Sequence, residues 1–115
     1  MRGARARLVL AIVETDRTFE RRDVRGEQLW VGRCIHCSSA LTVGPRGETY
    51  GATVEHIVAR THGGTDAIEN VALACARCNH GKGVRLDRRR RDDPRVREVQ
   101  ARMLARRRER WRGSE

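Results

Sequence analysis

Residues 53–83 read TVEHIVARTHGGTDAIENVALACARCNHGKG, and this stretch decides the fold. Its opening residues, 53–57, are rich in β-branched side chains and predict a strand. The Gly63-Gly64 pair then indicates a compact loop that closes at Asn70, and residues 71–74 predict a second strand. A helix is expected from Cys75, ending near Gly81 or Gly83. The order strand, loop, strand, helix predicts a ββα unit.

All four cysteines fall into two Cys-x-x-Cys pairs, Cys34/Cys37 and Cys75/Cys78, separated by 37 residues. This spacing is typical of two knuckles that share one tetrahedral zinc ion. The alternative, two disulfides, requires an exported protein, but the apolar run at 8–13 has only six residues and no small-residue cleavage site after it. We therefore favour a zinc site. No run approaches the roughly 20 apolar residues of a membrane span, so we expect a soluble, cytoplasmic protein.

The flanking segments divide the chain into three parts. Residues 1–26 form an N-terminal segment with a short helix expected at 8–15. Residues 27–83 form the core, where strands at 28–33 and 40–43 enter and leave the first cysteine pair as a hairpin. Residues 84–115 hold an Arg-rich C-terminal helix, with Asp93 as N-cap and Pro94 in its first turn. A weak apolar stripe marks this helix: Val96, Val99, Met103 and Trp111.

Positive charge is concentrated in the C-terminal part. The whole chain carries a formal net charge of +10, and residues 85–112 hold 13 arginines against five acidic residues, which gives +8. Such an asymmetry favours a polyanionic partner, and nucleic acid is the simplest one. The alternative is a solvated Arg-rich helix with no ligand.

Several spacings in the chain agree with one known family. Glu55-His56, Asn70 fourteen residues after His56, and Asn79 nine residues further resemble the ββα-metal (His-Me finger) arrangement of HNH endonucleases, across residues 34–83. The resemblance implies a small α+β fold with a zinc-knuckle hairpin and flanking helices. It also implies a metal-dependent endonuclease, bacterial or phage-encoded, that hydrolyses phosphodiester bonds in DNA and leaves a 5′ phosphate and a 3′ hydroxyl.

The resemblance also assigns roles to individual residues. His56 matches the general base, and imidazole suits this task because its unperturbed pKa of about 6.5 leaves much of it neutral at working pH. Glu55 and Asn79 match the two protein ligands of a catalytic ion, for which oxygen donors favour Mg²⁺ or Mn²⁺. Asn70 matches the residue that holds the loop so that the base is aimed. The structural zinc ligands would be Cys34, Cys37, Cys75 and Cys78.

Some assignments leave two alternatives open. His80 is a possible alternative to Asn79 as metal ligand, although the spacing favours Asn79. Lys82, one helical turn after Asn79, is either a phosphate contact or an ordinary solvated lysine. We also expect nucleic-acid contacts from Arg85, Arg88 and Arg89. His62 is expected to be a solvated loop residue, and His36, between two cysteines, is expected on the surface.

Two positions depart from the family pattern: Glu55 replaces a frequent aspartate, and Ala59 replaces a frequent proline. The expected partner is double-stranded DNA, held through its phosphate backbone, and a protein partner could supply specificity. The competing functional hypotheses are a non-catalytic, zinc-stabilised nucleic-acid-binding module and an accessory subunit of a larger DNA-processing complex.

Overall fold

Two antiparallel sheets organise the computed structural model, which describes residues 3–113. Strands β4 (Ala52–His56) and β5 (Val71–Cys75) form the smaller sheet, in which His56 lies opposite Val71. Helix α2 (Ala76–Lys82) follows β5 directly and packs on both strands. The predicted ββα unit is therefore present. The helix does not stop at Gly81 or Gly83, because a π-helical turn, η3 (Gly83–Asp87), extends it.

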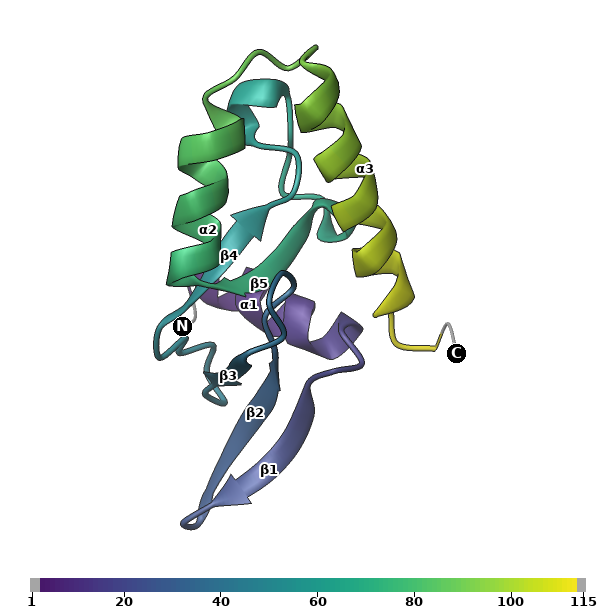
Figure 1. Cartoon of the computed structure of the whole chain (residues 1–115). Coiled ribbons are helices and arrows are strands. Elements are labelled where there is room, and N and C mark those ends of the chain that lie inside the picture. The colour runs from purple at the N-terminus through teal and green to yellow at the C-terminus, as the bar shows by residue number, and fades with distance from the viewer. Residues whose placement is uncertain (1–2, 114–115) are drawn as a thin grey trace.

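The second sheet carries the first cysteine pair. Its strand order is β1 (Glu20–Val24), β2 (Glu27–Arg33) and β3 (Ala40–Val43), and Cys34 and Cys37 lie in the connection from β2 to β3, as predicted. Strand β1 was not predicted, and all five of its residues are exposed. It pairs with β2 as a hairpin that projects from the rest of the molecule (Figure 1).

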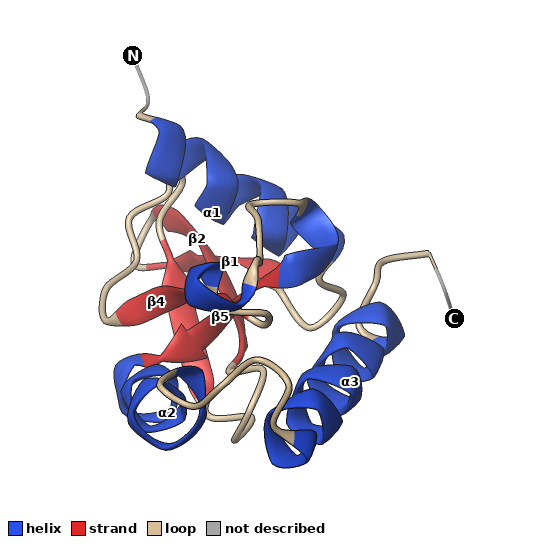
Figure 2. Ribbon diagram, turned by 90° about the horizontal axis from the view of Figure 1, so that it is seen from above, coloured by secondary structure: helices blue, strands red, loops and turns tan. Residues whose placement is uncertain are grey.

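Three helices surround the β4–β5 pair. Helix α1 (Ala4–Thr15) lies on one side, and α2 and α3 (Pro94–Glu109) lie on the other (Figure 2). The predicted cap of α3 is confirmed, because Asp93 accepts a hydrogen bond from the backbone N–H of Arg95 at 2.8 Å. The loop between β4 and β5 contains two short 3₁₀ turns, η1 (Arg60–His62) and η2 (Ile68–Asn70).

The hydrophobic core draws on all three predicted segments of the chain. Its buried side chains come from α1, the cysteine hairpin, β5 and α3, and include Val9, Ile12, Ile35, Val43, Leu73, Val99 and Met103. Phe19 is buried against Gly32 of β2, where a Cβ atom would lie 2.4 Å from the Phe19 ring. Only glycine fits at this position of the strand.

Arginines near the C-terminus bind the protein's own backbone. Arg106 donates to the carbonyl oxygens of Ile35 and His36, and Arg110 donates to that of Arg33. Arg112 donates to four carbonyls between Val13 and Phe19. Part of the predicted polyanion-binding charge is therefore structural. Within residues 3–113, none of the helices has the length and apolar character required to cross a membrane.

Candidate functional site

His56 is the last residue of β4 and its ring is held by a carboxylate. Its side chain is 21% exposed, and Nε2 lies 2.7 Å from Asp66 Oδ1. Arg60 also reaches this oxygen, at 2.7 Å. The hydrogen bond from His56, aided by the charge of Arg60, holds the pKa of the Asp66 carboxyl below its usual value. The sequence did not predict Asp66 as a site residue, because the path of the loop in the folded protein brings it to His56.

Asn70 closes the loop that carries Asp66. Its Nδ2 donates to the carbonyl oxygens of Val58 and Thr65, at 3.1 and 2.8 Å, and its Oδ1 accepts from the Val58 N–H at 2.8 Å. The side chain is therefore a bridge between the two ends of the loop. Gly64 allows the tight path of this loop, since a Cβ atom there would lie 1.7 Å from the Val58 carbonyl oxygen.

Glu55 points away from His56, because neighbouring side chains on a strand face opposite sides. It is only 1% exposed, and its Oε1 contacts Nε2 of His36. Its other oxygen, Oε2, is buried and has no hydrogen-bond partner within the described chain. The expectation that His36 lies on the surface is wrong: its side chain is 19% exposed and turns inward to this carboxylate.

Asn79 reaches β4 from the first turns of α2. Its Nδ2 donates to Thr53 Oγ1 at 3.0 Å and to the Val54 carbonyl oxygen at 3.2 Å. The amide thus lies against the backbone of the residue before Glu55, with Oδ1 as the atom that could bind an ion. His80 is exposed. Of these two neighbours, Asn79 is the one whose side chain contacts β4.

Lys82 does not take the surface position that a phosphate contact requires. It is 3% exposed, and its ammonium donates to the His56 carbonyl oxygen at 3.1 Å. It also pairs with both carboxylate oxygens of Asp87, at 2.8 and 3.1 Å. Lys82 therefore ties the end of α2 to the end of β4, which fixes the backbone of His56.

The four cysteines form one cluster. Their Sγ atoms all lie within 4.8 Å of one another, and none of them is in a disulfide. Zinc–sulfur bonds of about 2.3 Å in a tetrahedron place sulfurs about 3.8 Å apart, close to this spacing. Backbone N–H groups of His36 and Cys75 point at Cys34 Sγ, at 3.4 and 3.3 Å. The cluster can hold a structural metal ion of the zinc type and joins the β2–β3 hairpin to α2.

The thiols of this cluster differ in acidity. Hydrogen bonds from Ser39 lower the pKa of Cys37 to about 6, whereas burial raises that of Cys78 to about 12. Cys37 therefore loses its proton more readily than Cys78, for which a nearby cation would favour the thiolate.

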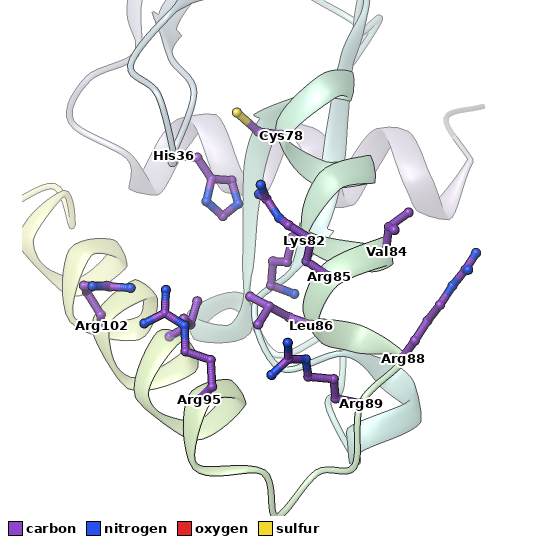
Figure 3. A pocket seen from close by; sticks show the side chains of 11 residues that line it. His36, Cys78, Lys82, Val84, Arg85, Leu86, Arg88, Arg89, Arg95 and Arg102 are labelled. Atoms are coloured by element: carbon purple, nitrogen blue, oxygen red, sulfur yellow. The ribbon is translucent and has the colours of Figure 1, made fainter.

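A groove of about 720 Å³ lies between η3 and α3 and is rich in positive charge. Among the residues that the structure describes, its lining includes no acidic residue and holds five arginines: Arg85, Arg88, Arg89, Arg95 and Arg102. The first three come from the segment after α2 and the last two from α3 (Figure 3). His36 also lines this groove. The sequence did not identify Arg95 and Arg102, whose position depends on how α3 packs.

His56 opens onto a different cavity, of about 530 Å³, which it shares with Arg5, Arg7, Arg60 and Asp66. The structure thus brings Glu55 to His36 and Asn79 to β4, while the His56 ring lies on the opposite face of the strand. Cationic side chains lie on both sides of β4.

Comparison with known families identifies the central segment. Residues 34–85 match the family model of the HNH endonucleases. The matched segment runs from the first zinc-type cysteine to the first arginine of the basic groove, and it contains Glu55, His56, Asn70 and Asn79. No curated protein and no solved structure matches the chain. The HNH match and the mixed helix-and-sheet architecture together support a nuclease-type, nucleic-acid-binding function.

Proposed function

We propose that this protein is a metal-dependent endonuclease that hydrolyses phosphodiester bonds in DNA, with a 5′ phosphate and a 3′ hydroxyl as products. The observation that carries the proposal is the position of His56 within the HNH segment. It ends β4, its ring is oriented by Asp66, and its backbone is held by Lys82. The contacts with Asp66 and Lys82 fix the position of His56, as the role of a general base requires.

His56 would act as the general base. A proton on Nε2 is donated to the Asp66 carboxylate, so Nδ1 carries the lone pair that can accept a proton from water. Asn70 keeps Asp66 in place by bridging Val58 and Thr65. These contacts hold the ring in one orientation before substrate arrives, which is the purpose of a preorganised site.

Glu55 and Asn79 would hold the catalytic cation. The unpartnered Oε2 of Glu55 fits this role, since a buried carboxylate oxygen without a donor is costly unless a cation or proton neutralises it. Oxygen donors suit Mg²⁺ or Mn²⁺. When bound, such an ion would neutralise charge on the phosphate. Because the His56 ring and the Glu55 carboxylate lie on opposite faces of β4, one phosphate can meet both only at the end of this strand, where His56 is the last residue.

Nucleic acid would be held through its phosphates. Arg85, Arg88 and Arg89 are exposed and line the groove, and Arg95 and Arg102 face them from α3. Contacts of this kind supply affinity without reading the base sequence. The same groove supports the second candidate, a nucleic-acid-binding module without catalysis, because it does not depend on His56.

A plasmid assay separates these two functions. Zinc-loaded protein is incubated with supercoiled plasmid and Mg²⁺ or Mn²⁺, together with His56→Ala and a histidine-matched control, His62→Gln. Glutamine removes the imidazole but keeps a donor for the Arg89 carbonyl oxygen, which His62 contacts at 2.7 Å. We expect nicking by the wild type and the control, a loss of at least 100-fold in His56→Ala, and nicks that DNA ligase can seal. Equal nicking by wild type and His56→Ala, with plasmid binding intact, would instead support the binding module.

A further inference from the structure

His36 is held firmly, although it lies in a tight connection between two cysteines. Its backbone N–H points at Cys34 Sγ, and its carbonyl oxygen accepts a hydrogen bond from Arg106 at 3.3 Å. Both backbone groups are therefore fixed, one by the cysteine cluster and one by α3. From this anchored position the His36 side chain reaches the basic groove that it helps to line (Figure 3). Its Nε2 contacts Oε1 of Glu55.

The pairing of His36 with Glu55 is incomplete as a structural ion pair. Buried ion pairs are tolerated when hydrogen bonds also satisfy the remaining lone pairs. Here, within residues 3–113, Oε1 has a partner and Oε2 is buried with none. A second polar side chain, Asn79, is fixed to the carbonyl oxygen of the adjacent residue, Val54. An imidazole nitrogen thus contacts the carboxylate whose second oxygen is buried and unsatisfied, and an amide is fixed to the backbone of the residue before that carboxylate.

We propose that His36 is a third protein ligand of the divalent cation held by Glu55 and Asn79. This inference rests on the proposed function and extends it. Nε2 of His36 would bind the ion in place of its present contact with Glu55. The ligand set then contains one nitrogen and two oxygens, which shifts preference from Mg²⁺ toward Mn²⁺, Co²⁺ and Ni²⁺. Because His36 lies between Cys34 and Cys37, the zinc-type cluster would also position a ligand of the catalytic ion.

Metal binding tests this inference without reference to cleavage. The zinc-loaded full chain is titrated with Mn²⁺, and free Mn²⁺ is followed by electron paramagnetic resonance. The comparison uses wild type, His36→Ala, His36→Phe and the control His62→Gln, which removes an imidazole but keeps a donor for the Arg89 carbonyl oxygen. We expect both His36 variants to bind Mn²⁺ about 10- to 100-fold more weakly, with the zinc content unchanged, whereas the control binds as the wild type does. The ratio of Mn²⁺ affinity to Mg²⁺ affinity should fall in the same variants.

Pulsed electron paramagnetic resonance supplies a readout that a purely structural role would not change. Mn²⁺ bound to the wild type should show coupling to an imidazole nitrogen, lost in His36→Ala and retained in His56→Ala. Absence of this coupling in the wild type overturns the inference even if no variant folds. Coupling that survives in His36→Ala, or Mn²⁺ affinity that is unchanged there, also overturns it.

Failure of the two proposals is distinguishable. If wild-type protein nicks plasmid in a His56-dependent way but shows no nitrogen coupling, only the role of His36 is lost. If it binds no Mn²⁺ and nicks no plasmid with any divalent ion, the endonuclease proposal and this inference fall together.

Discussion

Arg107 of α3 donates a hydrogen bond from Nε to the carbonyl oxygen of Val71 in β5, at 2.8 Å, in the interior of the protein. The side chain is 1% exposed, and Nη2 also reaches Thr15 Oγ1 at 2.7 Å and the Ile68 carbonyl oxygen at 3.2 Å. Burial lowers the pKa of this guanidinium, and the carboxylate of Asp16 partly offsets the effect. One buried side chain thus joins α3, β5, η2 and α1.

Replacement of Arg107 should therefore be strongly destabilising. Arg107→Ala removes these hydrogen bonds, leaves buried carbonyls unsatisfied and opens a cavity, so we expect a loss of about 3–5 kcal/mol in unfolding free energy. Urea unfolding of the zinc-loaded protein measures this loss of unfolding free energy. The control, Arg97→Ala on the exposed face of α3, should change stability by less than about 0.5 kcal/mol. Equal losses of unfolding free energy in Arg107→Ala and Arg97→Ala would contradict this structural role of Arg107.

Local sequence signals predicted most of the fold. Turn residues and β-branched runs indicated β2 to β5, and the Asp93-Pro94 pair indicated the start of α3. Strand β1 escaped prediction because its sequence, ERRDV, has no buried residue and is held by pairing with β2. Pairing with β2 uses backbone groups that every residue type has, so it leaves no signal in the side chains of β1.

The candidate site was predictable in position but not in orientation. The spacing of His56, Asn70 and Asn79 located three residues that the fold places on the ββα unit. The inward turn of His36 and the burial of Lys82 depend on partners 19 and five residues away, which only the folded chain selects. Residue type favoured the surface for Lys82, and the place of His36 between two cysteines gave it no visible partner in the interior.

Gly64 offers a test of the loop that carries Asp66. A Cβ atom at this position would lie 1.7 Å from the Val58 carbonyl oxygen, which is backbone and cannot move aside cheaply. We expect Gly64→Ala to lower stability by about 2–4 kcal/mol and to reduce nicking. Gly83→Ala is the matched control: it is helical with open space around its Cβ position, so it should be neutral or stabilise by up to about 1 kcal/mol. Thermal unfolding compares the two, and a stable, active Gly64→Ala would show that the loop takes another path.

Asp66 should matter for catalysis more than for stability. Asp66→Asn keeps the shape of the side chain but weakens the interaction that orients the His56 ring, so we expect kcat to fall about 10- to 100-fold with little change in thermal stability. The measurement is single-turnover nicking with saturating protein. Glu69→Gln, an exposed carboxylate in the same loop, serves as the control and should retain wild-type kcat. Equal kcat in Asp66→Asn would remove Asp66 from the site.

Removal of metal from the cysteine cluster should unfold the centre of the protein. The cluster joins the β2–β3 hairpin to α2, and buried core residues such as Cys34 and Ile35 lie beside it. We expect one zinc per chain, lost with a chelator or in Cys75→Ser, together with a large fall in Tm.

Acidification should also remove zinc and lower Tm, because protons compete with zinc for the thiolates. Burial favours the protonated form of Cys78, so zinc affinity should fall as pH is lowered. Elemental analysis and circular dichroism follow both changes, and full stability of the chelated protein would contradict a structural role.

The basic groove can be tested through the salt dependence of DNA binding. Arg88 and Arg102 are exposed and line the groove from different elements. Arg88 lies in the segment after α2, and Arg102 lies on α3. If each contacts one phosphate, the double variant Arg88→Gln/Arg102→Gln should weaken binding equally for unrelated sequences and reduce the slope of log Kd against log salt by about two. The matched control, Arg22→Gln/Arg25→Gln, removes the same charge from the projecting β1–β2 hairpin. Fluorescence anisotropy between 50 and 200 mM salt, roughly the range in which such slopes are measured, compares the pair. The slope reports how many phosphates the protein contacts. Identical slopes in the two double variants would therefore mean that the net charge of the protein, rather than this groove, holds the DNA.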